Sequence, residues 1–438
     1  MAEAPPPTRR PWWLPFPIPA GVGPEHIRLL GFIAFAMLFE NYDLGLIGAA
    51  LPQIGADFGL SDVEKGSLMG SIEVGSLAAF LIVPLADRVG RRRLLLACVV
   101  GMSLGSFLTA FAPTAQALAA CQILTRSFAS SASVVSFVMV AEEFPAGHRG
   151  WGIGVLAAVG SVGFGLGAGV YSQVNVIPYG WRSIYALGGL AILLLPFFRR
   201  NLTETRRYAA SAAGRAHVGG LSGAIRPVLA LVRNYPGRAL LLGAATFLAT
   251  AGHRPAFRFV SDFLQNAHGW SPGEYAALTV GFGALGIIGG PLAGRLGDRY
   301  GRRLIGAAML GAFPILAGLF YLGPASLIAL PWVLMVFCST ASGVVTRTLS
   351  TELFPTSMRT SAGGWILLVE TLGASLGLFV FAGLVVPLGG TGMALTAVAA
   401  TCFLGAIFLL FLPDTHRREL EAISEDPDAD SPAGAAAP

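Results

Sequence analysis

Single ionisable residues interrupt several apolar runs of this chain, and these residue types could carry chemistry there. An ionised side chain at the centre of a bilayer costs about 2.5–3.5 kcal/mol on insertion scales, so it normally faces a cavity and has a function. The candidates are Glu40, Asp43, Glu73, Arg126, His253, Arg254, Arg258, Arg347 and Glu370. We expect them to line one central, water-filled cavity.

Glu40 and Asp43 form an acidic pair in the first apolar run. They are three residues apart, so a helix places both side chains on one face. Two carboxylates in a low-dielectric cavity repel each other, and we expect one of them to keep a proton near neutral pH. This predicts proton coupling at Asp43 and Glu40, with a structural hydrogen bond to another helix as the alternative. For Glu73, in the second run, we expect a place at the outer mouth of the cavity or a contact with a ligand.

The stretch GHRPAFRFVSD, residues 252–262, combines bases with a helix-breaking proline. Pro255 removes a backbone donor and kinks or breaks the helix. Arg254 and Arg258 are four residues apart and share a helix face. Each guanidinium group can bind a carboxylate or phosphate through two hydrogen bonds. In the alternative interpretation, one or both arginines pair with the acids of the first run or with Glu370 and only neutralise charge.

Two further residues of the candidate set have more local interpretations. His253 is a candidate proton switch, because the ordinary pKa of histidine is about 6.5; a structural role is the alternative. Arg347 lies eight residues before Pro355, close to the end of its run. That position favours an inner-gate residue or one that extends its charge to the bilayer surface.

The composition sets the environment of these charges. The chain is 54% hydrophobic and 12% charged, whereas a soluble domain carries about 25% charged residues. Apolar runs long enough to span a bilayer lie near 29–52, 66–86, 94–112, 116–141, 151–176, 182–198, 239–264, 275–296, 304–322, 326–350, 361–386 and 392–412. The sequence therefore predicts an all-α membrane protein with twelve transmembrane helices in two six-helix bundles.

Basic residues cluster after the even-numbered runs. Cytoplasmic loops carry the excess of arginine and lysine, so both termini are predicted to be cytoplasmic in a multi-pass protein of the cell membrane. We expect a Pro-rich tail at 1–26, a first bundle at 27–198, a cytoplasmic linker at 199–237, a second bundle at 238–413, and a partly disordered tail at 414–438.

A basic turn occurs twice in the chain. Asp87-Arg88-x-Gly90-Arg91-Arg92 returns as Asp298-Arg299-x-Gly301-Arg302-Arg303. EEFPAGHRG at 142–150 returns as ELFPTSMRT at 352–360. Both offsets are about 210 residues, which indicates a duplicated unit with an even number of spans.

At these turns the chain resembles the major facilitator superfamily, whose loop signature between helices two and three has the form G-x-L-A-D-R-x-G-R-[RK]. The acidic ENYDLG segment and the LTETRRY and LPDTHRRELEAI segments resemble its metabolite–proton symporter, sugar porter and organic-ion branches. The resemblance implies two rocking halves and a central site, with Arg126 and Glu370 on helices that line it. It also implies a cytoplasmic gate that clamps the halves together, with plain positive-inside anchoring as the alternative. The gate residues are Asp87, Arg88, Gly90, Arg91, Arg92, Asp298, Arg299, Gly301, Arg302, Arg303, Glu142, Glu143, Arg149, Glu352 and Arg359.

Other functional classes lack sequence support. The chain has no nucleotide-binding loop, no cysteine–histidine cluster and no hydrolase triad order, so we expect no enzyme activity, cofactor or metal. The net charge of +5 fits a topological signal better than nucleic-acid binding. We predict a monomeric, proton-coupled importer of a small organic anion, with Arg254, Arg258, Arg126, Glu370 and Glu73 at the substrate. The alternatives are a drug or organic-cation efflux antiporter, a sugar or polyol porter, and a non-transporting membrane sensor.

Overall fold

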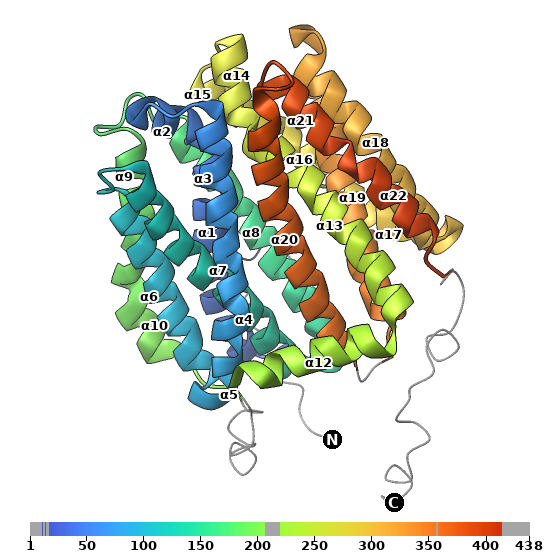
Figure 1. Ribbon diagram of the computed structural model, residues 1–438. Coiled ribbons are helices and arrows are strands. Elements are labelled where there is room, and N and C mark those ends of the chain that lie inside the picture. The colour runs from blue at the N-terminus through green and yellow to red at the C-terminus, as the bar shows by residue number, and fades with distance from the viewer. Residues whose placement is uncertain (1–10, 12–13, 15–16, 206–219, 356–357, 414–438) are drawn as a thin grey trace, which may run out of the picture.

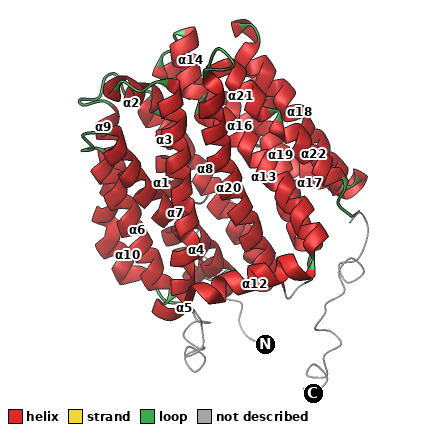
Figure 2. Ribbon diagram, viewed as in Figure 1, coloured by secondary structure: helices red, strands yellow, loops and turns green. Residues whose placement is uncertain are grey.

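A computed structural model describes residues 11, 14, 17–205, 220–355 and 358–413. Throughout these ranges the regular structure is helical and contains no strand (Figure 2). The prediction of an all-α fold is therefore confirmed.

The helices fall into two groups along the chain. The first group is α1 (Pro24–Ala49), α2 (Leu51–Phe58), α3 (Asp62–Val74), η1 (Gly75–Ala78), α4 (Ala79–Ile82), η2 (Val83–Leu85), α5 (Ala86–Val89), α6 (Arg91–Thr109), α7 (Ala115–Glu143), η3 (Ala146–His148), α8 (Arg149–Tyr171), α9 (Trp181–Gly189), η4 (Leu190–Leu194) and α10 (Leu195–Asn201). The second group begins with α12 (Gly220–Asn234) and continues through α13 (Pro236–Arg258), α14 (Val260–His268), α15 (Pro272–Ala277), η6 (Leu278–Phe282), α16 (Gly283–Gly286), α17 (Gly289–Tyr300), α18 (Arg302–Leu322), η7 (Ala325–Leu327), α19 (Ala329–Glu352), α20 (Arg359–Val385), α21 (Thr391–Ala399) and α22 (Thr401–Leu410).

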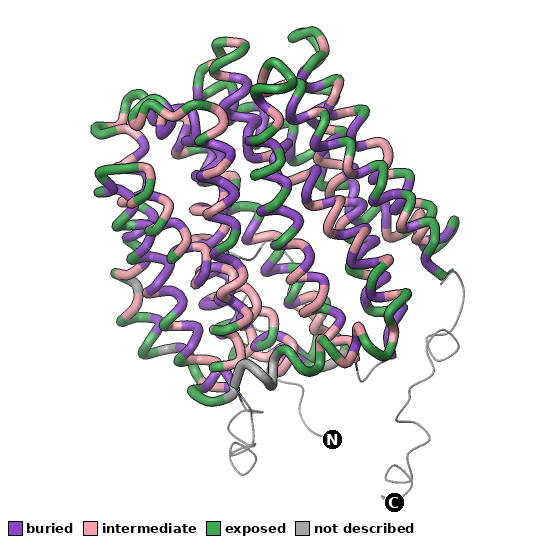
Figure 3. The backbone as a smooth tube through the Cα atoms, in the orientation of Figure 1, coloured by how far each residue is buried: buried purple, intermediate pink, exposed green. Residues whose placement is uncertain are grey.

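Within the described ranges, eleven helical stretches are long and apolar enough to cross a bilayer. Helix α13 supplies the twelfth crossing, because it packs along α20 and α22 over its length (Figure 1). It falls short of the others in hydropathy, since its last two turns carry His253, Arg254 and Arg258. The outer faces of the bundle, for example along α6 and α22 in Figure 3, expose leucine, isoleucine and phenylalanine, as a lipid-facing surface requires.

The two basic turns have the same backbone geometry. Gly90 and Gly301 have φ angles of 97° and 96°, in the region that favours glycine, and each ends one helix and begins the next. The turns at the opposite end of the molecule are duplicated too. Gly59 and Gly269 have φ angles of 63° and 66°, and each is followed by a serine that caps the next helix, Ser61 or Ser271.

The two ends of the bundle differ in how the groups are joined. Helices α5 and α12 lie at one end, which we call the basic end (Figure 1). There α12 lies across both groups and contacts η2 and α4 on one side and α13 and α20 on the other. At the other end, which we call the closed end, α14 packs against α1 and α2, and α15 packs against α8.

Candidate functional site

Two cavities meet near the middle of the molecule. The larger, of about 1190 Å³, lies between α1 and α8 of the first half and α13, η6, α16 and α19 of the second. The smaller, of about 430 Å³, lies within the second half between α13, α19 and α20. Arg254, Phe257, Ser339 and Thr340 line both cavities. A ligand that extends from this junction into the larger cavity would touch both halves of the protein.

Four charged side chains meet beside this junction. The carboxylate of Glu73 on α3 lies 2.7 Å from Nη2 and 3.2 Å from Nε of Arg258, both measured to Oε1. Its Oε2 lies 3.3 Å from Nη2 of Arg126 on α7, and Nε of Arg254 lies 3.8 Å from Oε1. Glu73 is 2% exposed, so the prediction that it stands at the outer mouth of the cavity is wrong. It also takes the place that the alternative interpretation gave to Glu40, Asp43 or Glu370 as the ion-pair partner of Arg254 and Arg258.

Close packing of glycines brings these groups together. Gly75 lies just after Glu73, and a Cβ atom there would lie 2.6 Å from the carbonyl oxygen of Ile123, so only glycine lets α3 approach α7 this closely. A Cβ atom on Gly48 would lie 3.3 Å from the carbonyl oxygen of Arg258. Arg258 also donates from Nη1 to the carbonyl oxygen of Leu44 at 2.7 Å. Helices α1 and α3 of the first half therefore hold Arg258 of the second half in place.

The three arginines differ in how freely a ligand can reach them. Arg258 is buried, with its guanidinium nitrogens bonded to Glu73 and Leu44. The Arg126 side chain is 14% exposed, and its Nε is buried without a hydrogen-bond partner. The Arg254 side chain is 34% exposed and lines both cavities. Arg254 is therefore the guanidinium group best placed to meet an anion.

Glu40 and Asp43 do occupy one face of α1, but that face points into the first half. Both line a void of about 10 Å³ between α1, α6, α7 and α9. Asp43 Oδ1 accepts a hydrogen bond of 2.8 Å from the hydroxyl of Ser106, and Oε2 of Glu40 is buried without a hydrogen-bond partner. Asp43 and Arg254 therefore line different cavities, and the expectation of one shared chamber is wrong for this conformation.

His253, Arg347 and Glu370 line the smaller cavity. The His253 ring packs edge-on against Phe313, with 4.0 Å between ring centroids, and its Nε2 is buried without a hydrogen-bond partner. Aromatic packing thus fixes the ring, while one nitrogen remains able to bond a ligand or a water molecule.

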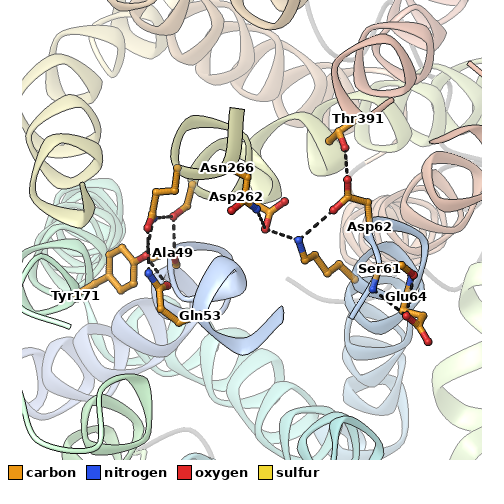
Figure 4. Close-up of polar contacts among 12 residues, drawn as sticks. Ala49, Gln53, Ser61, Asp62, Glu64, Tyr171, Asp262, Asn266 and Thr391 are labelled. Atoms are coloured by element: carbon orange, nitrogen blue, oxygen red, sulfur yellow. Dashed lines mark hydrogen bonds and ion pairs between the residues drawn. The ribbon is translucent and has the colours of Figure 1, made fainter. Parts of the chain in front are cut away.

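At the closed end, a buried lysine joins the two halves. Nζ of Lys65 on α3 lies 3.0 Å from Asp62 of its own helix and 2.9 Å from Asp262 on α14. Asp62 also accepts a 2.6 Å hydrogen bond from Thr391 of the second half. Figure 4 shows Asp62 and Asp262 on opposite sides of this link. Lys65 and Asp262 were absent from the sequence-based candidates, although Lys65 is the one lysine of the chain.

A second set of hydrogen bonds beside this link also crosses between the halves (Figure 4). Gln53 accepts from the hydroxyl of Tyr171 at 2.7 Å and donates to Gln265 of α14 at 3.0 Å. Ser261 donates to the carbonyl oxygen of Ala49 at 2.6 Å. These bonds and the lysine link fasten the closed end.

At the basic end, the predicted gate residues pair within each half. Arg91 pairs with Glu142 at 3.1 Å, and Arg302 pairs with Asp298 at 2.6 Å and with Glu352. Each of these pairs lies within one half of the molecule.

Backbone carbonyls bind most of the remaining gate arginines. Arg92 donates to Leu202 and Arg199, Arg303 to Leu412, Arg149 to Phe144 and Arg359 to Thr351. Arg88 and Glu143 also make contacts, and Arg299 lies over the ring of Tyr300. The side chain of Asp87 lies outside the described residues.

We expect Lys65→Ala to loosen the closed end. Removing one partner of a buried ion pair leaves uncompensated carboxylates. This should destabilise the conformation with a shut closed end by ~3–5 kcal/mol. The measurement is the rate at which a membrane-impermeant maleimide labels Val260→Cys, a buried α14 position, with the four native cysteines replaced by alanine. Lys65→Ala should raise this rate at least tenfold, whereas Lys65→Arg should stay close to the parent protein. Equal rates in all three proteins would contradict the role of Lys65.

Sequence comparisons extend these observations. A family model described as Major Facilitator Superfamily matches residues 33–349 and again residues 242–435. The gallate transporter of Pseudomonas putida is 28% identical over 423 residues, which cover 89% of this chain and 92% of that protein. The 4-hydroxybenzoate transporter of Pseudomonas aeruginosa is 25% identical over 393 residues, which cover 82% of this chain and 86% of that protein.

A solved structure shares the fold. A bacterial homologue of the human lysosomal transporter Spinster, in an inward-facing and occupied conformation, superposes with a TM-score of 0.71 at 18% identity. The match covers 89% of this chain and 97% of that one. The prediction of two six-helix bundles is confirmed.

Proposed function

The chain belongs to the Major Facilitator Superfamily, and from this premise we propose that it imports a small organic acid together with a proton. It is a membrane transporter rather than an enzyme. The two halves would rock about the central cavities and expose them to each side of the membrane in turn.

The observation that carries the organic-acid assignment is Arg254. Its guanidinium group is one-third exposed at the junction of two cavities, in the last two turns of α13, which run on through Pro255. A planar guanidinium group matches the two oxygens of a carboxylate and binds them more strongly in a dry cavity than in water. An anion bound there would balance positive charge in a site that is rich in arginine.

The cavity wall suits a flat, unsaturated acid. Phe257 and Trp332 meet edge to face with 5.7 Å between ring centroids, and Phe164 and Tyr275 also line the larger cavity. Such a wall favours an aromatic or conjugated ligand. Thr340 and Ser339 supply hydroxyl groups at the junction for polar substituents. The gallate and 4-hydroxybenzoate transporters, to which the chain is similar, carry substrates of this kind by name.

Proton coupling is assigned to Asp43, with Glu40 and His253 as further candidates. Asp43 is within the membrane-spanning part of α1, next to α7, which bears Arg126, and its void shares no lining residue with the larger cavity in this conformation. A group that is sealed from the substrate cavity in one conformation and hydrated in another can carry a proton across without a leak.

The remaining architecture follows from the same proposal. We assign residues 27–198 and 238–413 to the two moving bundles, with the linker at 199–237 and both termini in the cytoplasm. The basic end would then face the cytoplasm, and the lysine link would close the outer side. The protein would work as a monomer within the lipid bilayer.

Two other transport functions and a sensor function remain as competing hypotheses. Efflux of organic cations would use the intramembrane acids as binding charges, but the described geometry buries Glu73 under three arginines. A sugar or polyol porter would not need a cationic group at the cavity junction. A sensor would bind its ligand without moving it.

Uptake into proteoliposomes tests the proposed function. With the external medium more acidic than the lumen, we expect labelled 4-hydroxybenzoate to accumulate above its external concentration, and a protonophore should abolish this accumulation. Extrusion of cations driven by the same gradient would favour the antiporter, and binding without flux would favour the sensor.

A further inference from the structure

The ion pairs around Glu73, which lies midway along the apolar stretch Asp62–Leu85, join the two halves. Glu73 belongs to α3 of the first half, whereas Arg258 and Arg254 belong to α13 of the second. Arg126 of the first half completes the cluster. Any motion that separates α3 from α13 must break the bond between Glu73 and Arg258.

The cluster has more positive than negative charge. Three guanidinium groups share one carboxylate in the ion pairs described for these residues. Burial makes unpaired charges unfavourable, so the site favours a second anion. Arg254 makes the longest ion pair with Glu73, with 3.8 Å from Nε to Oε1, and its side chain is the most exposed of the three arginines. A second anion would therefore contact Arg254 first.

A substrate carboxylate at Arg254 would meet the Glu73 carboxylate within the same cluster. Both groups are planar anions attracted to the same guanidinium groups, and two carboxylates in one dry site repel each other. Arg254 lies beyond hydrogen-bond distance of Glu73 and can bond the ligand directly, and the bound ligand then weakens the attraction of the cluster for Glu73.

On this basis, and resting on the proposed function, we propose that Glu73 is a built-in competitor for the substrate carboxylate. It occupies the arginine cluster while the site is empty and joins α3 to α13. The incoming carboxylate displaces it from Arg254 and Arg258, and this displacement releases the two halves for the next step of the cycle. Glu73 is a positioning residue, since it acts through the arginines.

Binding of 4-hydroxybenzoate to the purified full chain in lipid nanodiscs, measured by calorimetry, tests the competition. Glu73→Gln removes the competing charge, and its Kd should fall at least tenfold below that of the parent protein. Glu73→Asp keeps the charge but withdraws it from the arginines, so its Kd should lie between the two. If the charge acted only at a distance, Glu73→Asp would match the parent. The control is Glu64→Gln, the same substitution at an exposed position of the same helix, and its Kd should not change.

Labelling of Val260→Cys at the closed end reports the release of the halves. In the parent protein, 4-hydroxybenzoate should raise the maleimide labelling rate. In Glu73→Gln, the rate should already be raised without ligand, an effect that a mere gain in anion affinity would not produce.

The outcomes separate this inference from the proposed function. Binding by the parent protein with no gain in affinity for Glu73→Gln overturns the role of Glu73 and leaves the proposed function intact. Binding by Glu73→Gln alone supports the competitor and speaks against 4-hydroxybenzoate as the substrate. Failure of both proteins to bind overturns both proposals. Should Glu73→Gln fold poorly, the comparison of Glu73→Asp with the parent decides the question.

Discussion

Arg254→Ala is expected to weaken binding of an aromatic carboxylate by about 10- to 100-fold. A hydrogen bond to a charged group contributes about 1.5–3 kcal/mol, and 1.4 kcal/mol corresponds to a tenfold change in Kd. Arg254 is the most exposed of the three clustered arginines and lines both cavities, so it should make the largest direct contact. The measurement is the Kd for 4-hydroxybenzoate together with the initial uptake rate in proteoliposomes.

Two further variants separate contact from charge. Arg254→Lys keeps the positive charge but loses the two-pronged donor geometry, so its Kd should lie between those of the parent and Arg254→Ala. Arg182→Ala is the matched control, because Arg182 pairs with Asp57 outside both cavities. Unchanged affinity in Arg254→Ala would remove the basis for an anion site.

Asp43→Asn is expected to abolish accumulation of substrate against a gradient while exchange of internal for external substrate continues. The amide is nearly isosteric with the carboxylate and can still bond the hydroxyl of Ser106, but it cannot bind and release a proton. Without that step the proton gradient no longer drives net movement, whereas the loaded protein can still change conformation. The two measurements are uptake driven by a pH gradient and counterflow in its absence.

The same pair of assays on Asp57→Asn provides the control. Asp57 bonds Trp181 and Arg182 away from the void that Asp43 lines, so both activities should persist. Loss of both activities in Asp43→Asn would indicate a structural role for Asp43. Retention of both would move proton coupling to Glu40 or His253.

The twelve transmembrane helices and their duplication were predictable from the sequence, because each helix in a bilayer is defined by its own residues. A helix in hydrocarbon must satisfy its own backbone hydrogen bonds, so hydropathy marks eleven of the spans, and only α13, with its charged residues, has a lower hydropathy. The repeated turns were also recognisable in the sequence, since each contains a glycine, Gly90 or Gly301, that adopts the same positive φ angle. The duplicated turn at the closed end, with Gly59 and Ser61 in the first half and Gly269 and Ser271 in the second, was also present in the sequence. It is short and these residues carry no charge, so it is inconspicuous.

The sequence also identified most of the charged residues of the site, because any ionisable group in an apolar run is conspicuous. Their ion-pair partners could not be predicted from the sequence. Spacing along one helix shows which side chains share a face, as for Glu40 and Asp43, but not which neighbouring helix that face meets. Glu73 was thus expected at the cavity mouth, and Lys65 was not among the candidates, although both are buried and paired across the halves.

The sequence by itself determined the membrane class, the twelve helices, the duplicated halves and the list of buried charges. The tertiary structure alone decided that Glu73 holds Arg126, Arg254 and Arg258, that Asp43 lies in a void apart from Arg254, and that Lys65 joins Asp262. The physical reason is that hydropathy and turn chemistry act over a few neighbouring residues. Ion pairing depends on how helices from both halves are rotated and how closely they approach each other. Close contacts, such as that of Gly75 with α7, determine this arrangement.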